Sequence, residues 1–443
     1  MKNLKKLSLY LILFGLISGV AIFRKPLTKK VDEDLSLSLK RNIRKILPSV
    51  LISHCENCVL NQLELKHKES QNILKIARMQ DILLSNGLKL EKYNILKGLY
   101  AGIYNLYPGS GYIEEHKNNI ILLSAKGIVG HSSKDNLKEF KQIKNNLNEF
   151  IGLDTFNKNR HLSFKDISII KNKIYVSYTQ ELKNDCFNTS ILSGTFNYDK
   201  INFENFFAPA NCIDANGGID NEFNAHQSGG RIIEFDDNNI LFTIGDYRNR
   251  ELTQNNKYVN GKIIKINIED PRKYELFSKG HRNPQGLLLD KKNQFVLETE
   301  HGPQGGDEIN LIKYTEKTKI IPNYGWPISS AGEHYGGKTK KNEPKYLKYP
   351  LYNSHKDYGY LEPLKSFVPS IGISEIEKIG EKKYVASSLK DNSLYFFNLD
   401  DKNKIINMER TLVYERIRDL HFVDNKLFLF MEDTASIGVI KIK

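Results

Sequence analysis

Repeated pairs of apolar segments, each pair joined by a short polar turn, constrain the fold of this chain more than any other feature. After Gly98 such pairs recur, and their turns are rich in Asp, Asn and Lys. The pairs span residues 167–177, 231–244, 286–298, 373–386 and 418–430. Turn residues of these types supply positive φ angles and local hydrogen bonds, so each pair predicts a β-hairpin. The chain after Gly98 is therefore expected to be all-β.

The length of this β-rich part bounds its architecture. Roughly 345 residues follow Gly98, which is enough for six blades of roughly 50–60 residues each. We therefore predict a six-bladed β-propeller over residues 98–443. A pair of β-sandwiches would show the same alternation, so the pattern alone leaves both architectures open.

Two segments with other patterns precede the β-rich part. Residues 7–23 form a long apolar run between lysines, and about 17 helical residues span roughly 26 Å, just enough to cross a bilayer. We expect residues 1–30 to be a membrane anchor or an export signal, and the protein to be periplasmic, either anchored to the inner membrane or exported. Between residues 31 and 97 we expect a short helical stalk or cap, because apolar residues recur there at helical spacing. These residues are Ile73, Leu74, Ile76, Ala77, Ile82 and Leu83.

The net charge of +13 raises the question of an anionic partner. A basic balance can indicate nucleic acid, an anionic membrane or an acidic small molecule. The lysines are dispersed along the chain, and no nucleic-acid-binding motif accompanies them. We therefore expect no nucleic-acid partner.

The four cysteines form one close pair, Cys55 and Cys58, and one distant pair, Cys186 and Cys212. No histidine follows the CxxC motif, which argues against covalent haem attachment, and no further zinc ligands stand near it. If the chain is exported, both pairs are predicted to form disulfides.

Three polar clusters stand where predicted strands give way to loops, at residues 225–231, 280–286 and 300–308. In the first, glycines let the backbone approach a ligand closely, and His226 could act as a base near neutral pH. The second presents several planar hydrogen-bonding side chains, beginning with His281. The third combines carboxylates with a glycine-rich backbone, which together offer the oxygen ligands that Ca²⁺ requires. On these residues alone, ordinary surface loops explain each cluster as well.

The order of three longer motifs is more specific. The runs GHRNPQGL, EHGPQGGDEINLI and NYGWP follow one another between residues 280 and 327. Together they resemble the soluble glucose dehydrogenase and aldose sugar dehydrogenase family, with the closer likeness to the aldose sugar dehydrogenase branch. Segments 388–391 and 416–419 extend the resemblance, which covers roughly residues 162–439. It implies a six-bladed propeller that uses pyrroloquinoline quinone (PQQ) and Ca²⁺.

The resemblance also implies roles for individual residues. His226 matches the base that takes the proton from the anomeric hydroxyl of the sugar while hydride leaves C1 for the quinone. The residues that match PQQ contacts are Arg282, Asn283, Tyr335, Lys390, Arg416 and Arg418. The carbonyls of Gly302 and Pro303 match ligands of the Ca²⁺ that also coordinates PQQ, while Glu308 and the Tyr324 carbonyl match a second, structural Ca²⁺ site. PQQ is a flat tricarboxylate, so a pocket rich in Arg and Lys suits its charge.

The sequence departs from the family pattern on the side that faces the sugar. Residues 160–164 stand where the family has a QGGLL-type segment, and four residues separate His226 from Arg231 where the family usually has three. We expect PQQ- and Ca²⁺-dependent oxidation of an aldose at C1 to the lactone, with an external electron acceptor that the sequence does not name. A non-catalytic propeller that serves as a binding module is the first alternative. A Ca²⁺-dependent propeller lactonase is the second, but it leaves Lys390, Arg416 and Arg418 without a role.

Overall fold

A computed structural model describes residues 49–70, 72–103, 109–217, 222–314, 320–335 and 347–442, with side chains described from Cys58 onward. The chain divides into two compact units, Met1–Glu56 and Asn57–Lys443. All described strands lie in the second unit. The predicted membrane anchor, residues 7–23, lies outside the described residues. None of the described helices is long and apolar enough to cross a membrane.

Six groups of four antiparallel strands make up most of the second unit, and further strands extend some of these groups into larger sheets. The first three contain β4 (Gly111–His116), β5 (Asn119–Ser124), β6 (Val129–Ser133) and β7 (Glu139–Gln142); β9 (Phe164–Ile170), β10 (Lys173–Lys183), β11 (Cys186–Thr195) and β13 (Glu204–Phe207); and β15 (Gly229–Asp236), β16 (Asn239–Ile244), β17 (Lys262–Asn267) and β18 (Tyr274–Lys279).

Three further sheets complete the set. They contain β19 (Pro284–Asp290), β20 (Phe295–Glu300), β21 (Asp307–Lys313) and β22 (Lys365–Phe367); β23 (Ile373–Gly380), β24 (Lys383–Ser388), β25 (Ser393–Leu399) and β26 (Ile405–Leu412); and β27 (Ile417–Val423), β28 (Lys426–Met431), β29 (Ser436–Lys441) and β3 (Lys89–Ile95).

The helix α4 (Ser49–Ser70) precedes the strands. The remaining elements are short: β1 (Ile73–Arg78), β2 (Ile82–Leu83), β8 (Lys144–Asn145), β12 (Lys200–Ile201), β14 (Ile213–Asp214), α5 (Leu153–Lys158) and the 3₁₀ turns η1 (Leu147–Glu149), η2 (Arg250–Thr253) and η4 (Lys356–Tyr358).

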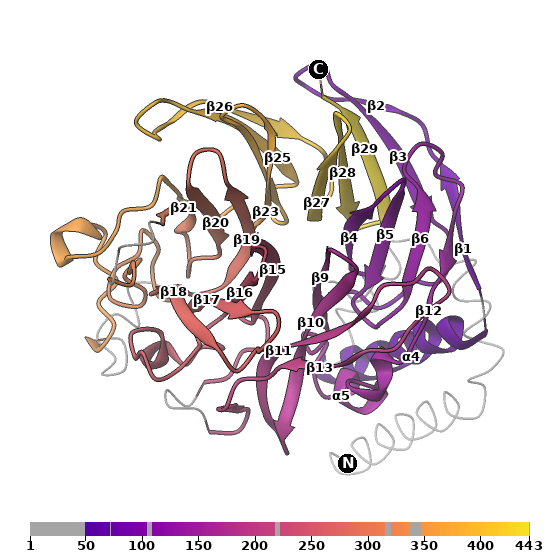
Figure 1. Cartoon of the computed structure of the whole chain (residues 1–443), viewed down its shortest axis with the longest axis horizontal. Helices are drawn as coiled ribbons and strands as arrows, with labels where there is room; N and C mark the ends of the chain where they lie inside the picture. Colours follow the sequence, from indigo (N-terminus) through magenta and orange to yellow (C-terminus); the bar gives the residue numbers. More distant parts are fainter. Residues whose placement is uncertain are drawn as a thin grey trace, which may run out of the picture. The chain divides into compact units, whose positions relative to one another are not determined.

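The first strand of each sheet lies at a common centre (Figure 1). In the order β4, β9, β15, β19, β23 and β27, each of these strands contacts the next, and β27 contacts β4. All six line a central channel of about 560 Å³. Hydrophobic clusters fill the space between neighbouring sheets, for example between the sheet of β4–β7 and that of β9–β13. The all-β, propeller-like prediction is confirmed, because paired sandwiches would not close such a ring.

The predicted hairpins are the first two strands of five of the sheets. Between β27 and β28, Val423 pairs with Lys426, which leaves a two-residue turn at Asp424 and Asn425. Both turn residues have positive φ, 50° and 57°. Two positive φ angles define the turn whose twist matches that of the flanking strands. Asp and Asn adopt this conformation at low cost, which is why the turn pattern could be read from the sequence.

The predicted helical stalk over residues 31–97 is correct for α4 but wrong from residue 73 onward. Strand β1 pairs with β7 and β3 pairs with β29. Because β1 also pairs with β3, this segment joins the first and last sheets into one ten-stranded sheet. Ile73 and Ile76, three residues apart, fit a helical spacing, but Leu74 and Ile76, two residues apart, alternate as in a strand. The partner strands that decide between the two lie far away in the sequence.

Buried acids tie neighbouring inner strands together around the channel. Asp166 Oδ2 accepts a hydrogen bond from the Ile232 amide, and Asp419 Oδ2 accepts one from the Ile113 amide, both at 2.7 Å. Arg231 Nη1 lies 2.7 Å from Asp166 Oδ1 and 2.8 Å from Asp419 Oδ1. Charge-assisted hydrogen bonds of this kind are stronger than neutral ones and fix geometry. The ring of inner strands is thus held by polar contacts at its axis as well as by apolar packing.

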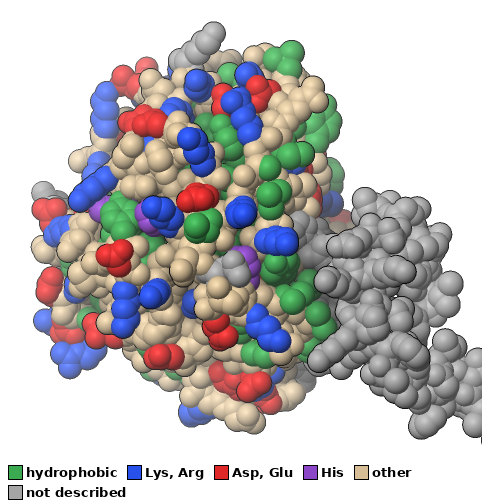
Figure 2. Space-filling view, turned by 90° about the vertical axis from the view of Figure 1, so that its right-hand side faces the viewer, with side chains coloured by type: hydrophobic (Ala, Val, Ile, Leu, Met, Phe, Trp, Pro, Cys, Tyr) green, Lys and Arg blue, Asp and Glu red, His purple; other side chains and the backbone are tan. Residues whose placement is uncertain are grey.

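Charge on the outside of the molecule is mixed. Figure 2 shows Lys and Arg side chains interspersed with Asp and Glu over the face in view. This agrees with the dispersed lysines of the sequence and gives no continuous basic stripe on that face.

Candidate functional site

Several of the polar residues that the sequence analysis selected lie close together, near the first residues of the inner strands. A small cavity of about 20 Å³ lies there on the axis. It is lined by Ile103, Tyr112, Lys165, His226, Ser228, Gly229, Arg231, Gln285 and Arg418. Arg231 also lines the large central channel, so its guanidinium stands between this cavity and the rest of the axis.

His226 lies in the turn that leads into β15. Its amide donates a hydrogen bond to Asn224 Oδ1 at 2.9 Å, and its ring stacks on that of His161 with 4.6 Å between centroids and 11° between planes. His301 approaches edge-on at 6.4 Å. Burial, and then the proximity of His161 and His301, holds the pKa of His226 well below its usual range. The imidazole is therefore neutral near pH 7 and able to accept a proton.

Arg282 lies between the His226 turn and the loop after β20. Its Nη1 donates to the carbonyls of His301 at 3.0 Å and Gly302 at 2.5 Å. The guanidinium also lies over the rings of Trp326, at 5.4 Å, and Tyr335, at 5.8 Å. Arg282 and Tyr335, which the resemblance assigns to one cofactor, are thus neighbours, with 3.5 Å between Nη2 and the Tyr335 hydroxyl.

Asn283 fastens the His226 turn to β19. Its Oδ1 accepts hydrogen bonds from the Gly229 amide at 3.2 Å and from Gln285 Nε2 at 3.0 Å. Gly229 has a φ of 61°, and a Cβ at this position would lie 2.9 Å from the Gly245 nitrogen. Glycine is therefore required for the turn to pass so close to the next strand.

Arg416 and Arg418 converge on one carboxylate. Glu432 Oε1 lies 2.7 Å from Arg418 Nε, and its Oε2 lies 3.2 Å from Arg416 Nε. Burial alone would raise the pKa of Glu432, but the two arginines lower it to about 2. Arg418 Nη2 is buried and makes no hydrogen bond to any described residue. One buried donor of Arg418 therefore has no acceptor among the described residues.

Lys390 is exposed and lies in the loop after β24. Its amide donates to the Ile371 carbonyl at 3.0 Å, and His301 Nε2 lies 2.5 Å from the carbonyl of nearby Ile373. The same short segment, residues 371–373, thus contacts both Lys390 and the site histidine.

The carbonyls of Gly302 and Pro303 lie in the loop between β20 and β21. Gly302 O accepts the hydrogen bond from Arg282 described above, and Pro303 O lies 3.5 Å from Ser370 Oγ. Asp307 holds this loop in place by accepting from the Gly302 amide at 3.2 Å. Within the described chain, the Gly302 carbonyl therefore already accepts one hydrogen bond, from Arg282.

A buried acidic cluster lies behind this loop. Glu298 pairs with Asn310, and Glu300 with Glu308, across β20 and β21. Asn310 Nδ2 donates to all three carboxylates at 3.0, 3.1 and 3.2 Å. Ligand atoms of Glu298, Glu300 and His281 lie within 4.8 Å of one another. Burial, and then the charge of Glu300, holds the pKa of Glu298 and of Glu308 well above the usual range.

Two atoms of the acidic cluster point to a missing partner. Glu298 Oε1 and Asn310 Oδ1 are buried and have no hydrogen bond to a described residue. Tyr324 belongs to the same region, because its ring stacks on His281 at 5.1 Å; its carbonyl lies 3.0 Å from His355 Nδ1.

Sequence reasoning assigned Glu308 and Tyr324 to a cation site and placed His281 and Glu300 in two separate polar clusters. It did not bring these residues together, and it missed Glu298 and Asn310. The available signal was the i, i+2 spacing of the two glutamates on one strand face, opposite Glu308 and Asn310 on the next strand.

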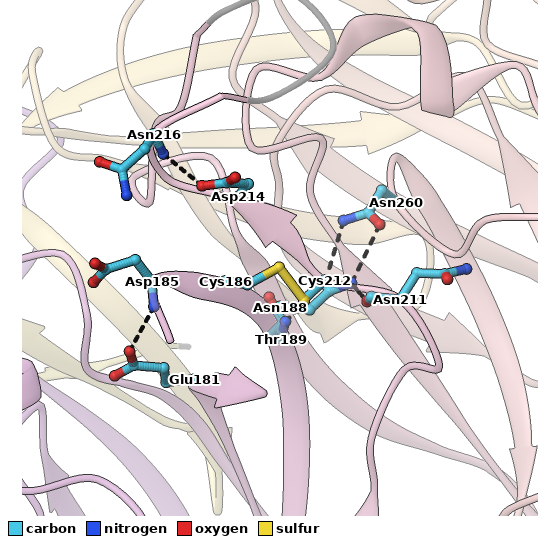
Figure 3. Close-up of a disulfide and its surroundings, with 10 residues drawn as sticks. All are labelled: Glu181, Asp185, Cys186, Asn188, Thr189, Asn211, Cys212, Asp214, Asn216 and Asn260. Atoms are coloured by element: carbon cyan, nitrogen blue, oxygen red, sulfur yellow. Dashed lines mark hydrogen bonds between the residues drawn. A yellow bond between two sulfur atoms is a disulfide. The ribbon is translucent and has the colours of Figure 1, made fainter. Parts of the chain in front are cut away.

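The disulfide Cys186–Cys212 fastens the chain that leads to the His226 turn (Figure 3). It links β11 to the loop before β14, and Asn188 Nδ2 supports that loop by donating to the Asn211 carbonyl at 2.7 Å. This predicted pairing is confirmed. Cys58 has a free thiol, and the side chain of Cys55 lies outside the described residues.

A family model described as glucose / sorbosone dehydrogenase matches residues 163–441. The chain belongs to the glucose/sorbosone dehydrogenase family. The resemblance inferred from the motifs is therefore confirmed, and all of the loops described above except that of His161 lie inside the matched region.

Three curated relatives match over parts of the chain. The chain is 31% identical over 221 residues to an uncharacterized protein of Synechocystis, covering 43% of this chain and 50% of that protein. It is 34% identical over 122 residues to aldose sugar dehydrogenase YliI of Escherichia coli, covering 25% and 31%. It is 32% identical over 131 residues to quinoprotein glucose dehydrogenase B of Acinetobacter calcoaceticus, covering 23% and 26%. The matches thus span half or less of the length of these relatives.

Solved structures support the fold. A glucose dehydrogenase crystal structure has a TM-score of 0.59 at 18% identity and covers 83% of this chain and 99% of its own. The soluble aldose sugar dehydrogenase of Escherichia coli, in its apo form, has a TM-score of 0.59 at 16% identity, covering 84% and 100%. At these identities the likeness shows a shared fold.

Proposed function

We propose that this member of the family is a PQQ- and Ca²⁺-dependent dehydrogenase that oxidises an aldose at C1 to the lactone. The observation that carries the proposal is the convergence of a neutral, buried His226 with Arg282 and Arg418 at one end of the axis. The names of two relatives, an aldose sugar dehydrogenase and a quinoprotein glucose dehydrogenase, support it. We infer further that the six sheets are the blades of a six-bladed propeller.

The residues present fit a flat, polyanionic cofactor. Arg418 Nη2 is a buried donor without an acceptor in the described chain, and a carboxylate oxygen is the acceptor that a guanidinium prefers. Arg282, Tyr335 and Arg418 would hold such a cofactor from different loops, with Arg416 and Lys390 toward the rim.

When bound, PQQ assisted by Ca²⁺ accepts the hydride that leaves C1 of the sugar. His226 takes the proton of the anomeric hydroxyl, so the sugar loses one hydride and one proton and its C1–O bond becomes the carbonyl of the lactone. Arg282, placed beside His301, would stabilise negative charge that develops near the site. An external electron acceptor completes the cycle.

The acidic cluster fits a hard cation. Glu298, Glu300 and Glu308 supply carboxylates, and Asn310 supplies a buried amide oxygen that has no hydrogen bond to a described residue. Ca²⁺ takes six to eight such oxygen ligands, and it would relieve the repulsion between three buried carboxylates. We propose that this cluster holds the structural Ca²⁺, with the Gly302 and Pro303 carbonyls serving the cofactor side.

We also propose that the protein acts in the periplasm, as an anchored or exported protein. The disulfide Cys186–Cys212 supports an oxidising compartment.

A non-catalytic binding module of the same fold is the second candidate. The cavity beside His226 measures about 20 Å³, whereas pockets for small ligands usually measure about 300–1,000 Å³. A site that stays this narrow would leave no room for both a cofactor and a sugar.

Dye reduction tests the proposed activity. The purified chain is incubated with PQQ and Ca²⁺, and a panel of aldoses is added with a redox dye as acceptor. We expect dye reduction that depends on the sugar, on PQQ and on Ca²⁺, with one lactone formed per two electrons. No reduction with any aldose would reject the dehydrogenase; hydrolysis of added lactone without dye reduction would indicate a lactonase instead.

A further inference from the structure

We propose that His161 is a positioning residue of the sugar site, which fixes the plane of the His226 imidazole by stacking on it and is itself held in place by Lys165. The inference rests on the proposed function in one respect, namely that His226 is the base. It adds a residue that lies outside the motifs that carry the resemblance.

The geometry of the two rings is the first observation. Their centroids are 4.6 Å apart and their planes differ by 11°, although His161 precedes β9 and His226 precedes β15. The stack of His281 on Tyr324 is less parallel, at 25°, and the rings of His131 and Tyr198 are tilted by 59°. A nearly parallel stack between turns of two different sheets restricts rotation of both rings.

The turn that carries His161 is clamped by buried polar contacts. Lys165 Nζ donates to the His161 carbonyl at 2.5 Å, and the His161 amide donates to Asn159 Oδ1 at 2.9 Å. A second buried lysine, Lys126, lies 3.4 Å from the carbonyl of Leu162. A lysine is rarely buried without a specific partner. Two buried lysines bind carbonyls of the turn that carries His161, which indicates that the position of this turn matters.

One ring nitrogen of His161 has no hydrogen-bond partner among the described residues. Its Nδ1 is buried and makes no hydrogen bond to any described residue. The orientation of this ring therefore comes from the stack and the clamped backbone.

The neighbouring groups that affect the pKa of His226 most act in one direction. They are His161, His301, Arg418 and Lys165, and each of them lowers it. None of them stabilises a charged imidazole, so His226 rests in the neutral form that a base requires. Because general-base catalysis depends on geometry before it depends on pKa, a ring held in one plane gives a fixed direction for proton transfer.

Two substitutions separate stacking from bulk packing. His161→Ala removes the stack, whereas His161→Phe keeps a flat ring in its place. We expect His161→Ala to lower kcat by about 10- to 100-fold, the cost of misplacing a reacting group by about 1 Å, with PQQ affinity within about 2-fold of the wild type. His161→Phe should restore kcat to within about 3-fold. His131→Phe, at a ring contact far from the site, is the matched control and should leave kcat unchanged.

The proposal is overturned if His161→Ala keeps full kcat. It is also overturned if kcat and PQQ affinity fall together and His161→Phe rescues neither, since that pattern indicates a purely structural role.

A measurement without turnover separates this inference from the proposed function. The ring protons of His226 are followed by NMR as the pH is changed, in the chain without PQQ or sugar. In His161→Ala we expect the resonance to shift and its titration to move to higher pH, because solvent enters and a neighbouring imidazole is lost. An unchanged resonance and titration would reject the stack, whereas wild-type protein that oxidises no aldose would reject only the dehydrogenase.

Discussion

At the scale of single residues, Arg231, which lies on β15, connects four other inner strands through one guanidinium. It forms ion pairs with Asp166, Asp419 and Glu375, and its Nε donates to the Gln285 carbonyl at 3.1 Å. Three buried carboxylates therefore surround this guanidinium, and no other described cation contacts them as closely.

Arg231→Met should therefore destabilise the fold by about 3–5 kcal/mol, because it leaves buried carboxylates without their partner. Urea unfolding at pH 7 measures the change. Arg272→Met is the matched control, since Arg272 is 90% exposed and pairs only with Asp270; a surface pair contributes about 0–1 kcal/mol. Equal losses in the two variants would contradict the role given to Arg231.

His226 carries the catalytic prediction at this scale. His226→Ala should lower kcat by about 10²–10⁴-fold, the usual contribution of a general base. The affinity for PQQ should change little, because the cofactor contacts lie on other residues. Steady-state dye reduction measures the change in kcat, and equilibrium binding of PQQ measures the change in affinity. A variant that keeps most of its activity would show that another group takes the proton.

At the scale of elements, β3 joins the last sheet to the first, because it pairs with β29 and with β1, which in turn pairs with β7. Leu90 in β3 is fully buried, whereas Leu83 in the neighbouring β2 is 76% exposed. Leu90→Ala should cost about 2–5 kcal/mol of unfolding free energy, and Leu83→Ala less than about 0.5 kcal/mol. Chemical denaturation compares them. Similar small losses would mean that residues 73–95 are a separate appendage, as the sequence pattern had predicted.

The disulfide Cys186–Cys212 belongs to the same scale. It closes a segment with a sequence separation of 26 and holds the loop that leads to His226. Replacing both cysteines by alanine should cost about 2–4 kcal/mol, mainly by freeing the unfolded chain. Unfolding with and without reductant measures this cost, and the wild type under reduction should match the double variant. If reductant leaves the unfolding free energy of the wild type unchanged, the disulfide does not contribute this stability.

The strands also show which parts of the fold can be predicted from the sequence and which cannot. The hairpins β9–β10 and β27–β28 could be predicted because partner strands are neighbours in the sequence and their turns use Asp, Asn and Lys. Strand β3 could not, because its partner β29 lies at the other end of the chain and local periodicity carries no information about it. The same holds for the site: His226 and Arg282 could be predicted from motifs, but the stack of His161 on His226 depends on the packing of two sheets.

At the scale of the whole unit, the channel along the axis contains acids with unusual protonation. Burial raises the pKa of Glu114 and of Glu377 to about 7, while His421 lies 3.5 Å from the first and 3.9 Å from the second. A carboxyl whose pKa is higher in the folded state stabilises the fold fully below its unfolded value of 4.5. That stabilisation is lost as the pH rises through about 7.

Glu377→Gln should therefore flatten the pH dependence of stability. Between pH 5 and pH 8 the wild type should lose on the order of 1–3 kcal/mol more than this variant. Thermal unfolding across that range checks the difference, and Glu409→Gln, on the exposed face of β26, should behave as the wild type does. If stability depends on pH in Glu377→Gln as steeply as in the wild type, the raised pKa of Glu377 does not cause this dependence.

Calorimetric titration with PQQ in the presence of Ca²⁺ tests the central claim most directly. The account predicts one PQQ bound per chain, with affinity lowered at least about tenfold in Arg418→Met, because a charge-assisted hydrogen bond contributes about 1.5–3 kcal/mol. Lys402→Met, in the turn between β25 and β26, should bind as the wild type does. No uptake of PQQ, or equal affinity in Arg418→Met and the wild type, would contradict a cofactor site at the axis.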